Sequence, residues 1–131
     1  MRRLLTAVFL LVAAPAAAQE AEIQSVIEGQ MQAFQAGDPA AAFEFASPMI
    51  KGMFGNPRTF GMMVQRGYPM VWNNAETRFL ELREIDGALW QKIRIRDEAG
   101  GVYLMDYRMV QTENGWQIDG VVELPAPDVG V

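Results

Sequence analysis

Four side chains near the C-terminal end of the chain have types and spacing that could support proton transfer. Asp106 and Asp119 are carboxylates, and Tyr103 and Tyr107 are phenols, in segments rich in strand-forming residues. A carboxylate in a pocket can act as a general base, and a nearby phenol can stabilise developing charge on an oxygen. Successive side chains of a strand point to opposite faces, so the tyrosines are predicted to face inward and the aspartates outward. This sorting weighs against a catalytic base.

Two other carboxylates remain as candidates for a general base. Glu44 lies in a segment with helical spacing, and Glu81 lies in a predicted strand. The simpler interpretation places Glu44 on a solvated helix surface and Glu81 on the outer face of the sheet. We therefore assign no catalytic residue, and a binding protein is favoured over an enzyme.

The chain contains no histidine and no cysteine, which removes several classes of chemistry. These residues supply ligands for zinc, haem and iron–sulfur clusters and form the base–nucleophile pairs of many hydrolases. Carboxylates alone could hold calcium or magnesium, but no D-x-D-x-D-G run supports such a site. We predict no metal and no cofactor. The net charge of −5, without a basic run, argues against nucleic acid as a partner.

Methionine is abundant, with nine residues of this type in the chain. Thioethers bind Cu(I), and Met49 and Met53 are spaced to lie on the same side of a helix. Two other interpretations stay open. Methionine fills irregular cores, and together with aromatic side chains it lines adaptable pockets for apolar ligands.

The first residues have the pattern of an export signal. Arg2 and Arg3 form a positive segment, an apolar run follows over Leu4–Ala14, and Ala16–Ala18 provides a small-residue cleavage site. A membrane anchor is the alternative. It fails on length, because a span needs about 20 apolar residues and Pro15 interrupts this run.

This pattern sets the expected location and the division of the chain. We expect cleavage near Ala18 and a periplasmic or secreted protein without a membrane anchor. The absence of cysteine excludes a lipid-anchored lipoprotein. Residues 1–18 are then the signal peptide, residues 19–124 a single domain, and residues 125–131 a C-terminal tail.

Helical signals dominate the first half of the predicted domain. An amphipathic helix is predicted over Glu20–Ala36, because its apolar residues recur at helical spacing. Three shorter helices begin where an N-cap residue precedes proline, and they are predicted over Pro39–Ala46, Pro48–Phe54 and Pro57–Arg66. Tyr68–Trp72 contains Pro69 and is predicted as a short edge or irregular strand.

Strand signals dominate the second half. Four strands are predicted over Thr77–Ile85, Leu89–Arg96, Val102–Gln111 and Trp116–Leu124. Asp86-Gly87 predicts a tight hairpin turn, and Asn114-Gly115 predicts a type I′ turn in which both residues have positive φ. Helices followed by an antiparallel meander indicate an α+β fold, with helices on one face of a curved four-stranded sheet.

Alternation along these strands separates an apolar face from a charged face. Leu89, Gln91, Ile93 and Ile95 share the face that should meet the helices, and so do Trp116, Ile118 and Val122. The opposite face should be solvated and carry cross-strand ion pairs. Trp90 is the unusual member of that charged face. It could mark an interface, lie over the stems of its basic neighbours, or be covered by the chain terminus.

Several short strings resemble a known family. They are Phe43-Glu44-Phe45-Ala46-Ser47-Pro48, Phe54-Gly55, Phe60, Met63-Val64, Tyr68 and Trp116-Gln117-Ile118-Asp119-Gly120. Over nearly all of the chain after the export signal, they resemble a small bacterial family called domain of unknown function 4864. The resemblance implies a nuclear-transport-factor-2-like fold, the cone-shaped α+β group that includes ketosteroid isomerases. It implies a pocket between sheet and helices, but no reaction.

Three functions follow as alternatives. The first is binding of a small apolar or amphipathic ligand, with five aromatic residues near the pocket: Phe43, Tyr68, Tyr103, Tyr107 and Trp116. The second is a protein-interaction or homodimerisation module that uses the outer sheet face and Trp90. The third is a cofactor-free isomerase-like enzyme.

Overall fold

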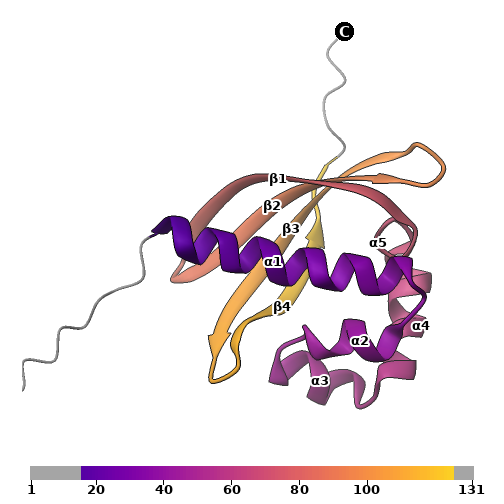
Figure 1. Cartoon of the computed structure of the whole chain (residues 1–131), viewed down its shortest axis with the longest axis horizontal. Coiled ribbons are helices and arrows are strands. Elements are labelled where there is room, and N and C mark those ends of the chain that lie inside the picture. Colours follow the sequence, from indigo (N-terminus) through magenta and orange to yellow (C-terminus); the bar gives the residue numbers. More distant parts are fainter. Residues whose placement is uncertain (1–15, 126–131) are drawn as a thin grey trace, which may run out of the picture.

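The computed structural model describes residues 16–125, in which helices come first and strands follow (Figure 1). The helices are α1 (Ala16–Gln35), α2 (Pro39–Glu44), α3 (Pro48–Phe54), α4 (Pro57–Gly67) and α5 (Pro69–Trp72). The strands are β1 (Asn74–Ile85), β2 (Ala88–Asp97), β3 (Val102–Thr112) and β4 (Gly115–Glu123). Consecutive strands pair antiparallel in the order β1-β2-β3-β4, and α1 lies across one face of the curved sheet. The predicted α+β fold is confirmed, and the nuclear-transport-factor-2-like cone, with which it is compatible, stays a prediction.

The short helices begin where the sequence predicts them. The side chains of Asp38, Ser47 and Asn56 each accept a hydrogen bond from a backbone N–H of the first turn, and proline follows each of them. Helix α2 ends earlier than predicted, because the backbone after it pairs with β4. Ile118 donates its N–H to the carbonyl of Phe45 at 2.9 Å, and Ser47 donates to the carbonyl of Ile118 at 2.8 Å.

The strand predicted over Tyr68–Trp72 is wrong. Pro69 is the first residue of the helical turn α5, where its missing N–H costs nothing. Val71 and Trp72 both donate their backbone N–H groups to the carbonyl of Tyr68, at 2.9 and 3.1 Å. Proline can break a strand, as the sequence-based prediction assumes, but here it starts a helix.

One of the two predicted hairpin turns differs from the expectation. Asp86 and Gly87 have φ values of 50° and 80°, as a type I′ turn requires. Between β3 and β4 only Gly115 has positive φ, at 92°, so the type I′ turn predicted at Asn114-Gly115 is wrong. The Thr112 hydroxyl accepts from the backbone of Asn114 and donates to the carbonyl of Gly115, which stabilises a different turn.

The core lies between α1 and the inner face of the sheet. Ile23 and Ile27 of α1 are fully buried, and so are Ile93, Ile95 and Met105 on the two central strands. Burial of these apolar side chains is the main stabilising contribution to this interface. The predicted inner face of β2 and β3 is confirmed. No helix within residues 16–125 has the length and apolar character that are needed to cross a membrane.

The predicted inner face of β4 is wrong for Val122. Met109 pairs with Ile118 and Arg108 pairs with Gly120, so Asp119 is an extra residue in a β-bulge. After the bulge, each side chain of β4 points to the face opposite to the one that simple alternation predicts. Val122 therefore lies on the outer face opposite Asp106 and is 49% exposed.

Candidate functional site

A cavity of about 320 Å³ opens between the inner face of the sheet and the helices. It is lined by residues of α1, α3, α4, α5, β3 and β4 and by the segments between them. The lining residues are Gln30, Phe34, Ala46, Met49, Ile50, Met53, Phe54, Phe60, Met63, Val64, Tyr68, Val71, Tyr107, Ile118, Asp119, Gly120 and Val121. The wall is therefore made mainly of aliphatic, aromatic and methionine side chains.

Methionines gather where the cavity opens to solvent. Met49 and Met53 of α3 line it and are 51% and 64% exposed, while Met63 of α4 is half-buried in the wall. Unbranched thioether side chains can adjust to ligands of different shape. The fold therefore contains a cavity lined by methionine and aromatic side chains.

Tyr107 and Tyr68 contribute the two phenols of the cavity wall. Tyr107 is fully buried, and its hydroxyl has no hydrogen-bond partner among the described residues. Burial, and to a lesser extent the neighbouring Tyr68, raises the pKa of Tyr107, so its hydroxyl stays protonated. The hydroxyl of Tyr68 donates to the carbonyl of Val121 at 3.2 Å.

Alternation predicts Asp119 on the outer face, but it is the extra residue of the bulge and lies in the lining of the cavity. Its side chain is only 14% exposed. The Ser47 hydroxyl donates to Oδ1 at 2.7 Å, and Arg108 Nη1 lies 3.6 Å from Oδ2. Both carboxylate oxygens have partners, which argues against Asp119 as the base of an isomerase-like reaction.

The structure brings together only two of the five predicted ligand-binding residues. Tyr68 and Tyr107 line the cavity, whereas Phe43, Tyr103 and Trp116 do not. The ring of Phe43 packs on the far side of the wall, with its centroid 5.4 Å from that of the Phe60 ring. Tyr103 packs beside the turn that precedes β3, and Trp116 lines a separate groove near the hairpin between β3 and β4.

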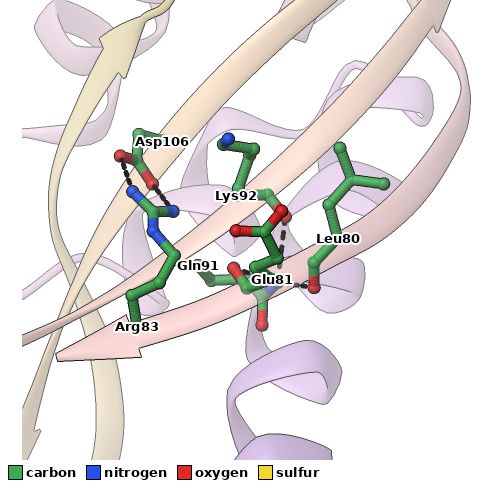
Figure 2. A network of polar contacts seen from close by, with 6 residues as sticks. All are labelled: Leu80, Glu81, Arg83, Gln91, Lys92 and Asp106. Carbon is green, nitrogen blue, oxygen red and sulfur yellow. Dashed lines mark hydrogen bonds and ion pairs between the residues drawn. The ribbon is translucent and has the colours of Figure 1, made fainter.

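The outer face of the sheet carries an ion pair that is more buried than expected. Figure 2 shows the guanidinium of Arg83 bonded to both carboxylate oxygens of Asp106, at 3.0 and 2.7 Å. Asp106 does point outward as predicted, but it is 7% exposed rather than solvated. Arg83 pairs with Trp90 across the neighbouring strands, and Trp90 and Asp106 border the same hollow.

Gln91 supports β1, the strand that carries Arg83. It is fully buried on the inner face, opposite a bulge between Phe79 and Leu82 of β1. Its amide donates to the carbonyls of Leu80 and Lys92, at 3.0 and 2.9 Å (Figure 2). The side chain satisfies a backbone carbonyl that the bulge removes from the ladder.

Trp90 lies on the outer face, as alternation predicts. It borders a shallow hollow together with Ile85, Asp86, Arg108 and Val122. Ile85 is 43% exposed, so this hollow presents apolar surface to solvent.

The remaining carboxylate candidates lie away from the cavity. Glu44 and Glu81 are both exposed, and neither lines it. Among residues 16–125, no group of three or more acidic side chains is close enough to hold a metal ion. The sequence places neither Gln30 nor Asp119 at the cavity, because helical periodicity does not distinguish Gln30 and alternation puts Asp119 on the outer face.

Comparison with known proteins gives a family but no activity. No curated protein matches the chain. The family described as Domain of unknown function (DUF4864) matches residues 16–131, which include every described helix and strand. The chain therefore belongs to this family, as the strings around Phe43–Pro48 and Trp116–Gly120 suggest.

Proposed function

We propose that the protein binds a small apolar molecule in the cavity between the sheet and the helices. The observation that carries this proposal is the wall itself, which is mainly apolar and encloses about 320 Å³. Such cavities, with few polar groups, are typical of small-molecule sites. The exposed Met49 and Met53 at the opening support entry of a ligand without unfolding of the core.

We further propose that binding takes place outside the cytoplasm, after cleavage near Ala18. The apolar run Leu4–Ala14, on which this proposal rests, lies outside the described residues. Cleavage would remove only the first turn of α1, in which Ala16 and Ala17 are exposed. The buried residues of α1 begin at Ile23, so the core would be unaffected.

The experiment is titration of the purified protein with N-phenyl-1-naphthylamine, a neutral apolar fluorophore that brightens when it leaves water. Ile50→Trp places a large side chain in the wall and should abolish the signal. Met62→Trp is the matched control, because Met62 is 39% exposed on α4 and does not line the cavity. Saturable binding lost only in Ile50→Trp supports the proposal. No saturable binding, or equal binding by both variants, overturns it.

A second candidate is homodimerisation through the hollow on the outer face. The favouring observation is that Ile85, Trp90 and Val122 lie there beside charged residues of both signs, which are Asp86, Asp106 and Arg108. A two-fold interface places the same patch on both copies, so a patch with both charges can complement itself. Sedimentation equilibrium should then give a dimer that Trp90→Glu dissociates. A monomer at all concentrations rejects this candidate.

A further inference from the structure

Tyr107 lines the cavity, and the described part of the fold leaves its buried hydroxyl unpaired. Tyr107 is 0% exposed, and its hydroxyl has no partner among the described residues. It lies on β3 between Gln91 of β2 and Val121 of β4, at the centre of the inner face. A buried hydroxyl without a partner is costly, which leaves it available to a ligand that can satisfy it.

We infer that the ligand is a neutral apolar molecule with a carbonyl or ether oxygen that accepts a hydrogen bond from the Tyr107 hydroxyl. This inference rests on the proposed function and specifies the ligand of the same cavity. It assigns Tyr107 as the residue that recognises the ligand's polar group, while the apolar wall accommodates the rest.

Neighbouring groups indicate an acceptor on the ligand. The Tyr68 hydroxyl already donates to the carbonyl of Val121, and the Gln30 amide donates to the carbonyl of Ala42 at 3.2 Å. Burial raises the pKa of Tyr107, which keeps its proton in place. The Tyr107 hydroxyl is therefore the phenolic donor in this wall that no protein acceptor engages.

The charges of the wall indicate a neutral ligand. Among residues 16–125, no lysine or arginine lines the cavity, so a carboxylate ligand would be buried there without a countercharge. The acidic side chain of the wall, Asp119, is already engaged by Ser47 and lies close to Arg108, so it does not call for a cationic ligand. A ketone, ester or ether satisfies the hydroxyl without bringing a charge into the cavity.

The test compares two ligands of nearly equal shape, 2-acetylnaphthalene and 2-ethylnaphthalene, by titration of the wild-type protein and two variants. The first has a carbonyl where the second has a methylene group. Tyr107→Phe should weaken binding of the ketone about two- to tenfold, the range of one neutral hydrogen bond, and leave the hydrocarbon within about twofold. Met62→Trp is the control, because Met62 is exposed and does not line the cavity, and it should leave the ratio of the two affinities unchanged.

The outcomes separate the two proposals. If both ligands bind and Tyr107→Phe does not change their affinity ratio, the inference about Tyr107 is wrong, while the proposed function stands. If neither ligand binds the wild-type protein, the proposed function fails and the inference fails with it. Thermal unfolding provides a second measurement without ligand. Removal of an unpaired hydroxyl should leave the melting temperature of Tyr107→Phe unchanged or raised, and a clear decrease would mean that the hydroxyl is paired within the protein.

Discussion

Asn74 joins three elements, and its removal should destabilise the fold strongly. The residue is 1% exposed at the start of β1. Its amide donates to the carbonyl of Met31 in α1 at 3.1 Å and to that of Val71 in α5 at 2.7 Å. Its side-chain oxygen accepts from Gln35 Nε2 at 2.7 Å. Helices α1 and α5 both contribute walls of the cavity, so this residue also fixes the shape of the candidate site.

The expected magnitude follows from these contacts. Asn74→Ala removes three hydrogen bonds, each contributing about 1 kcal/mol net, so the free energy of unfolding should fall by about 3 kcal/mol. With an m-value of about 2 kcal/mol/M, the midpoint of urea unfolding should fall by about 1.5 M. Tryptophan fluorescence can follow the transition, because the Trp72 ring packs 5.7 Å from that of Phe34 in the core.

Asn73→Ala is the matched control. Asn73 is the preceding residue, is exposed and makes no side-chain hydrogen bond among those described, so its replacement should change the unfolding free energy by less than about 0.5 kcal/mol. Equal midpoints for the two variants would refute the assigned role of Asn74. Asn74→Asp gives an independent check, since it places a carboxylate against two carbonyl oxygens. Burial favours the protonated form of the introduced carboxyl, so this variant should lose stability as the pH rises above about 4.

Two further predictions concern stability. Gly52→Ala should raise the unfolding free energy by about 0.5–1 kcal/mol, because Gly52 lies inside α3 with no atom near an added Cβ. Gly29→Ala should lower the unfolding free energy by about 1–3 kcal/mol, because an added Cβ would lie 2.5 Å from Phe45 Cζ. Shifts of the melting temperature in the same direction for both glycine variants would contradict this reasoning. The hydrogen bond from Arg96 lowers the pKa of Glu76 in the folded protein. The ion pair therefore stabilises the fold at neutral pH, and this stabilisation is lost as the pH falls through the lowered pKa. Glu76→Gln should therefore lose less stability than the wild-type protein in acid unfolding curves, and identical curves would argue against the pair.

Local signals in the sequence predict most of the secondary structure because their causes are local. Proline after an N-cap residue starts a helix whatever surrounds it, and Pro48–Phe54 is found with the predicted bounds. Alternation in β2 and β3 depends only on the extended backbone, so the burial of Ile93 and Met105 is correctly predicted. The same rules fail at Pro69 and at the turn containing Asn114, where contacts with neighbouring groups select another local conformation.

The composition of the cavity is less predictable, because alternation assigns a residue to a face but not to a position on that face. Tyr103 and Tyr107 share the inner side of β3, yet only Tyr107 lies where α1, α3 and α4 leave a space. Phe43 and Trp116 are likewise separated from the cavity by packing against other elements. Such separation depends on how the helices dock, which involves residues far apart in the sequence.

The sequence by itself determines the family, the helices-then-strands order and the inner face of the central strands, because these depend on local pattern and composition. Only the tertiary structure decides that Asp119 lines the cavity, because its bulge forms where β4 pairs with both β3 and the Phe45–Ser47 segment. It likewise decides that the Tyr107 hydroxyl is buried without a partner, since that depends on every element packed around it.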